Sequence, residues 1–144
     1  MSSSVFLSVV IPCFDEMANL QKGVLDKVKS FLDKKKIDYE VIISDDGSKD
    51  GSIEFLSSFI KDNPQFQLLE NEHAGKAGAV THGVLSAKGK YILFTDMDQA
   101  TPIEEVNKLL PFFDQSYDVV IGSRSNRRKG APFTRLFISR ANIL

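Results

Sequence analysis

Short β-branched runs alternate with helical segments along this chain, and this alternation constrains the fold more than any other feature. Strand-like runs are found at 7–11, 39–44, 66–69, 91–95 and 117–121. Helical apolar spacing is found at 17–35, 53–60 and 76–87, and again after Pro102. Strands that alternate with helices in this way predict an α/β fold, with a mostly parallel sheet of five strands and helices on both of its faces.

Polar residues follow the predicted strands, where an open parallel sheet binds its ligand. In such sheets the ligand lies beyond the carboxyl ends of the strands, at the point where the strand order reverses. The candidate residues are therefore those just after each strand: Asp15, Glu16, Asp45, Asp46, 71–76, Asp96, Asp98, Ser123 and Arg124.

Length and composition predict one ordinary globular domain over residues 1–144. The chain is 42% hydrophobic and 26% charged, which is enough for a real core. No apolar run reaches the roughly 18 residues that a transmembrane helix needs, and the first residues lack a basic signal-peptide region. Cys13 is the one cysteine, so an intrachain disulfide is excluded and a reducing, cytoplasmic location is expected.

Two common phosphate-binding motifs are absent. The segment around Gly75 and Lys76 lacks the upstream glycine of a P-loop, and Ala77 stands where Ser or Thr should follow the lysine. The first strand-to-helix turn, 12–16, contains no glycine of a dinucleotide fingerprint. A P-loop nucleotide hydrolase and a dinucleotide-dependent dehydrogenase are therefore both disfavoured.

Asp96 and Asp98 are the most informative acidic pair, at the end of a very apolar strand. Residues two apart on an extended chain lie about 6.6 Å apart and project to one side. At an effective dielectric of about 20, their repulsion is about 2.5 kcal/mol, which a bound cation would offset. Mg²⁺ or Mn²⁺ suits such hard oxygen ligands. A solvated turn is the alternative reading of this pair taken alone.

Asp45 and Asp46 form a second acidic pair, followed by Gly47 and Ser48. Asp, Gly and Ser are typical turn formers, so a structural role is one interpretation. Two adjacent acids at a strand end exceed what a turn requires, and one of them could accept a hydrogen bond from a nucleobase or ribose. The residues alone leave both readings open.

The last 23 residues, 122–144, form a basic segment. They contain Arg124, Arg127, Arg128, Lys129, Arg135 and Arg140, without one acidic residue. This charge predicts an anionic partner at the C-terminal end. We expect no nucleic acid partner.

Five motifs in order and register resemble the nucleotide-binding half of the glycosyltransferase family 2 enzymes, which have the GT-A fold. They are SVVIPCFDE at 8–16, VIISDDGSKDG at 41–51, NEHAGKAGAVTHG at 71–83, YILFTDMD at 91–98 and VVIGSR at 119–124. The resemblance covers nearly the whole chain. It implies a GT-A, Rossmann-like α/β sandwich.

The resemblance also implies roles for particular residues. Contacts to the nucleotide-sugar would come from Pro12, Glu16, Asp45 or Asp46 or both, Lys76 and Asp96. Asp96 and Asp98 would hold Mg²⁺ or Mn²⁺ on the donor diphosphate, and with Arg124 they would form the catalytic group. Arg124, Arg135 and Ser139 would bind the phosphate of the acceptor.

Within the family, DMDQATPIEE at 96–105 and the basic segment look most like the polyprenyl- or dolichyl-phosphate glucosyl- and mannosyltransferases. The implied function is metal-dependent, inverting transfer of a hexose to a lipid phosphate at the cytoplasmic face of a membrane. UDP-glucose is the favoured donor and GDP-mannose the second. The alternatives are a family 2 enzyme with a glycan hydroxyl acceptor and a non-catalytic nucleotide-sugar-binding module.

The chain ends at Leu144 inside what reads as a helix, whereas relatives continue with acceptor-site and often membrane segments. We therefore expect a C-terminally truncated form that binds nucleotide and turns over slowly, and a longer form that is anchored to a membrane. The sequence leaves the oligomeric state open, with a homo-oligomer compatible with it.

Overall fold

A computed structural model describes residues 5–123 of the chain. The chain divides into two compact units, Met1–Asn107 and Lys108–Leu144. The first unit contains the sheet. It is built from four parallel strands: β1 (Leu7–Cys13), β2 (Tyr39–Asp45), β3 (Phe66–Glu70) and β4 (Tyr91–Phe94).

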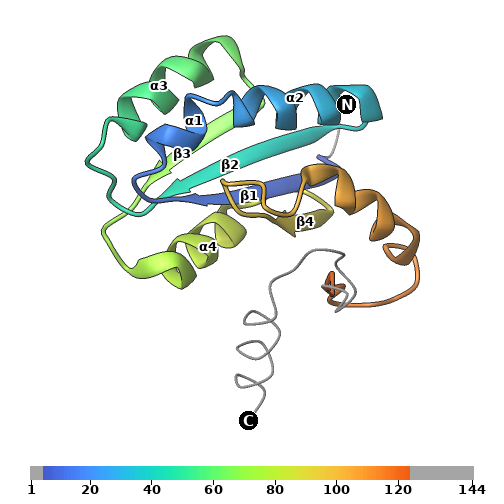
Figure 1. Cartoon of the computed structure of the whole chain (residues 1–144). Coiled ribbons are helices and arrows are strands. Elements are labelled where there is room, and N and C mark those ends of the chain that lie inside the picture. Colours follow the sequence, from blue (N-terminus) through green and yellow to red (C-terminus); the bar gives the residue numbers. More distant parts are fainter. Residues whose placement is uncertain (1–4, 124–144) are drawn as a thin grey trace, which may run out of the picture. The chain divides into compact units, whose positions relative to one another are not determined.

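The strand order is β3-β2-β1-β4, so the chain reverses direction across the sheet after β3 and returns to the far side of β1. The helices α1 (Met17–Leu20), α2 (Val24–Lys35) and α3 (Ser52–Asp62) cover one face, and α4 (Gly75–Ser86) covers the other (Figure 1). The predicted parallel α/β sandwich is confirmed. The reversal point lies between the carboxyl ends of β1 and β4, where a ligand site is expected.

The core lies on both faces of the two central strands. Val9 and Val10 of β1 and Val41 and Ile42 of β2 are fully buried, although neighbouring residues point to opposite faces. Strands buried on both faces require continuous apolar runs, which explains why these strands were readable from the sequence.

A buried polar cluster holds the amino ends of the strands in register. The carboxylate of Glu40 accepts hydrogen bonds from Ser8 Oγ at 2.6 Å, Lys88 N at 2.7 Å and Gln67 Nε2 at 2.9 Å. Ser8 Oγ in turn accepts the Gly89 N–H at 2.8 Å. The cluster therefore connects β1, β2 and β3 with the loop that leads into β4.

We expect Gly89→Ala to destabilise the protein by about 1–3 kcal/mol, the usual cost of overpacking. A Cβ at this position would lie 2.5 Å from Ser8 N and 2.8 Å from Tyr91 O, and both are backbone atoms that cannot rotate away. The free energy of unfolding in urea measures the effect. Gly122→Ala is the control, because a Cβ there meets no atom within 4 Å. Equal unfolding energies for the two variants would contradict this packing.

The helix predicted at 17–35 is two helices. α1 ends at Leu20, and Gly23 lies in the left-handed region with φ 71° before α2 begins at Val24. The apolar spacing runs on across this break, because Leu20 and Val24 are both buried. The break arises from the backbone conformation at Gly23, which glycine adopts without steric cost.

The prediction of a fifth strand at 117–121 is wrong. Within residues 108–123 there is no strand, and the side chains of Tyr117, Val119 and Ile121 are 59–81% exposed. A strand requires a partner for its backbone groups, and 117–121 pairs with no other described segment. The helix predicted after Pro102 consists of two short 3₁₀ helices, η1 (Ile103–Lys108) and η2 (Leu110–Phe112). Across residues 5–123, no helix is both long enough and apolar enough to cross a bilayer.

Candidate donor-binding site

A cavity of about 280 Å³ lies at the predicted reversal point of the sheet. Its lining comes from the end of β1, from the loops after β1, β2, β3 and β4, and from α4. The lining residues are Pro12, Cys13, Phe14, Glu16, Asp46, His73, Gly75, Lys76, Ala79, Asp96, Met97 and Asp98. Of the predicted nucleotide and metal residues that the structure describes, all except Asp45 line this cavity.

Asp96 and Asp98 reach the cavity from a turn rather than from an extended strand. β4 ends at Phe94, and a turn contains Met97 and Asp98. The Met97 side chain is buried in the core, at 1% exposure, so it anchors the turn between the two carboxylates. Asp98 is exposed, and its Oδ1 accepts the Ala100 N–H at 2.9 Å. Two acidic side chains therefore line one cavity, but a turn places them there and not the extended geometry that the spacing argument assumed.

The Gln99 amide fixes the shape of this turn. Its Nε2 donates to Asp96 O at 2.7 Å, and its Oε1 accepts the Ile103 N–H at 2.9 Å. Gln99 itself has φ 49°, an uncommon backbone conformation that these two bonds help to hold. The Gln99 side-chain amide therefore stabilises the backbone of this turn.

Lys76 places a positive charge next to the acidic pair. Its Nζ lies 2.6 Å from Asp96 Oδ1 and 5.6 Å from the centre of the Phe94 ring. Asp96 Oδ1 is buried and, among residues 5–123, accepts no regular hydrogen bond. The Lys76 ammonium is thus the group that compensates its charge.

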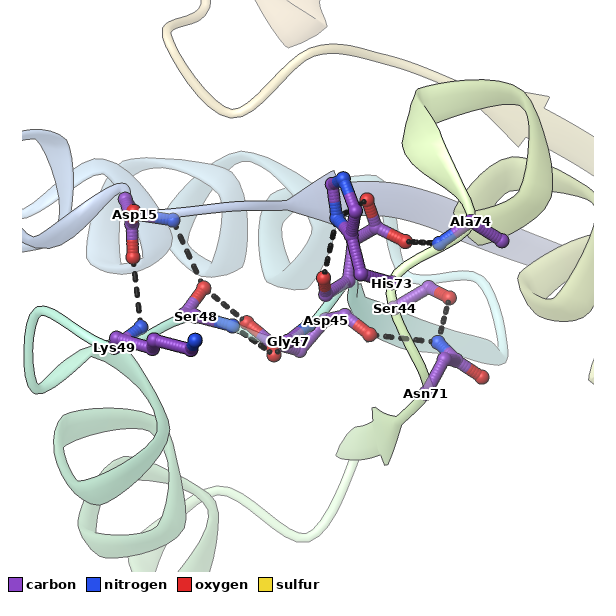
Figure 2. Close-up of polar contacts among 10 residues, drawn as sticks. Asp15, Ser44, Asp45, Gly47, Ser48, Lys49, Asn71, His73 and Ala74 are labelled. Atoms are coloured by element: carbon purple, nitrogen blue, oxygen red, sulfur yellow. Dashed lines mark hydrogen bonds and ion pairs between the residues drawn. The ribbon is translucent and has the colours of Figure 1, made fainter.

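Asp45 and Asp46 have different surroundings. Asp45 is fully buried, and its Oδ1 accepts the N–H groups of Gly47 and Ser48, both at 2.9 Å (Figure 2). Its Oδ2 accepts a short hydrogen bond from Ser48 Oγ. The Asp45 carboxylate is therefore occupied by its own turn, whereas Asp46 lines the cavity.

The Asp46 carboxylate joins two loops. Its Oδ2 lies 2.8 Å from His73 Nδ1, and its Oδ1 accepts the Ala74 N–H at 2.8 Å. His73 Nδ1 also lies 3.1 Å from Asp46 O. Because both neighbours of Nδ1 are oxygen acceptors, Nδ1 carries a proton, and Nε2 is the ring nitrogen left for a ligand.

Phe14 is a site residue that the sequence reasoning missed, and His73 lay within the candidate segment 71–76 but was given no role. Their ring centroids lie 4.9 Å apart at the edge of the cavity, and both side chains are largely exposed. Exposed aromatic surface next to a cavity is typical of a stacking site. Pairing of β2 with β3 places the loop at 71–74 beside the loop at 45–48. The strand order would therefore have been needed to predict that His73 lies at the cavity.

The first loop is held against the loop at 46–52 by hydrogen bonds that involve three acidic or hydroxyl side chains. Asp15 Oδ1 accepts the Lys49 N–H at 2.7 Å, as Figure 2 shows, and Ser48 Oγ accepts the Asp15 N–H at 2.9 Å. Ser52 Oγ accepts the Glu16 N–H at 3.1 Å. These contacts fix the position of Glu16 at the cavity.

Cys13 lines the cavity as an unreactive thiol. Burial raises the pKa of Cys13 to about 12, and the nearby Asp45 carboxylate adds to the shift. The thiolate is the nucleophilic form, so this side chain stays protonated near neutral pH. Its role is packing at the end of β1.

The remaining predicted site residues, Arg124, Arg135 and Ser139, lie outside the described residues. Within 5–123, no group of three or more His, Cys, Asp or Glu side chains is arranged to hold a metal ion. Asp96 and Asp98 are thus a pair of carboxylates and not part of a larger cluster within these residues.

The sequence model of Glycosyl transferase family 2 matches residues 8–140, which is nearly the whole chain. The chain belongs to this family. The suspected family is therefore confirmed, and the first four of the five motifs contribute residues to the cavity lining.

Curated family 2 relatives align with most of the chain. A dolichyl-phosphate beta-glucosyltransferase of Dictyostelium discoideum is 35% identical over 134 residues, which cover 85% of this chain and 41% of the relative. An undecaprenyl-phosphate 4-deoxy-4-formamido-L-arabinose transferase of Aeromonas hydrophila is 36% identical over 124 residues, which cover 85% of this chain and 38% of the relative. The chain spans about two fifths of the length of these relatives.

Solved structures share the fold. The mannosyltransferase PcManGT of Pyrobaculum calidifontis, in complex with GDP-Man and Mn²⁺, is 23% identical, with a TM-score of 0.58 over 70% of this chain and 30% of that one. S. aureus TarS is 21% identical, with a TM-score of 0.61 over 90% of this chain and 23% of that one. At these identities the comparison supports the predicted GT-A fold and nothing finer.

Proposed function

We propose that this chain is the donor-binding part of a glycosyltransferase that moves a hexose from a nucleotide-diphosphate sugar to a polyprenyl or dolichyl phosphate. One observation carries the proposal: a single cavity brings together Asp46 and His73 on one side and Lys76, Asp96 and Asp98 on the other. The first group suits a nucleoside and the second suits a diphosphate with its cation.

A divalent ion fits the acidic side of this cavity. Asp96 Oδ1 accepts no regular hydrogen bond within residues 5–123 and faces the Lys76 ammonium at 2.6 Å, and Asp98 presents an exposed carboxylate. Hard oxygen ligands of this kind suit Mg²⁺ and Mn²⁺, which retain water and phosphate ligands when a protein supplies only one or two carboxylates. Bound there, the ion would stabilise the negative charge that develops on the departing diphosphate.

The start of α4 supports diphosphate binding on the same side. Its N-cap residue, Ala74, has no side chain that could cap the helix, and no acidic residue stands in the first turn. The first N–H groups of a helix and its dipole together attract anions. Lys76 in this turn adds a full positive charge.

The nucleoside would lie on the other side of the cavity. Phe14 and His73 offer aromatic surface for the base, and His73 Nε2 offers a polar contact. Glu16 and Pro12 line the same part of the cavity, and the Glu16 carboxylate also accepts a hydrogen bond from Asn19. We keep UDP-glucose as the favoured donor and GDP-mannose as the second, on the resemblance to the lipid-phosphate subgroup.

The acceptor is proposed from the relatives, whose names include dolichyl phosphate and undecaprenyl phosphate. A phosphate is already largely ionised near neutral pH, so such an acceptor needs no general base. Arg124, Arg135 and Ser139 are the residues proposed to bind it, by charge-assisted hydrogen bonds. Transfer would invert the anomeric centre at the cytoplasmic face of a membrane, where the protein binds peripherally.

Calorimetric titration of the chain with UDP and GDP, each with Mn²⁺ and with EDTA, tests the proposal. We expect UDP to bind more tightly than GDP, and removal of Mn²⁺ to weaken UDP binding at least about tenfold, as the loss of a bridging cation requires. Equal affinity with Mn²⁺ and with EDTA would refute the metal site, and absence of nucleotide binding would refute the donor site.

A further inference from the structure

The cation position beside Asp96 is filled by a side chain of the protein itself. Lys76 Nζ lies 2.6 Å from Asp96 Oδ1, and that oxygen is buried from solvent. The Asp96 side chain as a whole is 45% exposed, so the contact is a partly exposed ion pair in which the ammonium is the positive charge that compensates this oxygen. In the chain without donor, Lys76 provides this charge.

Lys76 lies where its own helix disfavours a positive charge. It is the second residue of α4, and the helix dipole places a partial positive charge at that end. The Lys76 side chain is largely exposed, and its ammonium contacts the Asp96 carboxylate and the face of the Phe94 ring. An anion at the start of α4 would suit the ammonium and the helix dipole together.

We infer that Lys76 is a resident counter-cation of Asp96 that a divalent ion must displace, so that metal and donor diphosphate bind cooperatively. This inference rests on the proposed function. One carboxylate oxygen cannot bind an ammonium group and a divalent ion together without repulsion between the two cations. A diphosphate removes this conflict, because its negative charges give the Lys76 ammonium a second partner while the ion takes Asp96.

Cooperativity of this kind is reciprocal, so the nucleotide strengthens Mn²⁺ binding by the same factor as Mn²⁺ strengthens nucleotide binding. Lys76 determines the size of this factor. Removing its charge improves binding of Mn²⁺ alone and reduces the advantage that the nucleotide confers.

The test measures Mn²⁺ affinity of the chain by electron paramagnetic resonance of the free ion, with and without saturating UDP. In Lys76→Met, we expect Mn²⁺ alone to bind about tenfold more tightly than in the wild type, within the usual range of coupled sites. We also expect UDP to improve Mn²⁺ affinity less than it does in the wild type. Lys49→Met is the matched control, because Lys49 is exposed and does not line the cavity.

Unchanged or weaker binding of Mn²⁺ alone by Lys76→Met, with Mn²⁺-dependent UDP binding intact in the wild type, would overturn this inference and leave the proposed function standing. UDP binding that is independent of Mn²⁺ in every variant would overturn the metal site and the inference together. Circular dichroism of Lys76→Met checks that α4 is retained, which we expect because methionine is a good helix former.

Discussion

Asp98→Asn is expected to weaken Mn²⁺-dependent UDP binding on the order of 100-fold, because altering even outer-shell groups of metal sites costs roughly 10- to 100-fold. The substitution removes the charge and keeps a side-chain oxygen for the Ala100 N–H, which Asp98 now binds at 2.9 Å. The turn should therefore keep its shape. Calorimetric titration with UDP in the presence of Mn²⁺ measures the loss.

Asp62→Asn is the control for this prediction. Asp62 is exposed at the end of α3 and does not line the cavity, so the variant removes one negative charge away from the site. We expect Asp62→Asn to bind UDP with wild-type affinity. If Asp98→Asn also retained wild-type UDP affinity and Mn²⁺ dependence, Asp98 would not be a metal ligand. A non-catalytic nucleotide-binding module would then be the better interpretation.

Asp46→Ala is expected to weaken nucleotide binding at least about tenfold and to lower the free energy of unfolding by about 1–3 kcal/mol. The Asp46 carboxylate is buried and compensates both the Ala74 N–H and His73 Nδ1. Without it, this N–H loses its partner and the His73 ring loses the contact that orients it. Titration with UDP and urea unfolding measure the two effects separately.

The exposed neighbour Glu72 provides the control for the Asp46 experiment. Glu72→Ala removes an acidic side chain from the same loop without changing the cavity lining, so UDP affinity and the free energy of unfolding should both stay at wild-type values.

His73→Phe tests whether Asp46 acts through the histidine, because the variant retains a ring next to Phe14 and loses Nδ1. Affinity for UDP in His73→Phe close to that of Asp46→Ala would show that Asp46 acts through the histidine. Wild-type affinity in His73→Phe would contradict that.

The two central strands, β1 and β2, were predictable because burial on both faces imposes an apolar, β-branched composition on them. β1, β2, β3 and β4 each begin at the residue that the sequence predicted, and each ends within two residues of the prediction. The break at Gly23 was not predictable from periodicity, since buried Leu20 and Val24 continue the helical spacing across it. The segment 117–121 has strand composition, but composition alone does not supply a partner strand.

The candidate site was predictable as a set of loops, but the role of each residue was not. Asp45 and Asp46 are adjacent and chemically identical, and the hydrogen bonds of the Gly47–Ser48 turn decide which carboxylate is free for a ligand. Because neighbouring strand residues point to opposite sides, only one of the pair could reach the cavity. His73 required the pairing of β2 with β3, which is a long-range property of the fold.

The central position of β1 has a consequence for how donor preference can change during evolution. Aromatic residues after β1 and β3 face one end of the cavity, whereas the acidic turn after β4 faces the other end. Under the proposed function, substitutions at Phe14 and His73 would change which base is accepted, while the acidic turn after β4 would keep its role towards the diphosphate. A single scaffold could in this way accept different donors without a change in that turn.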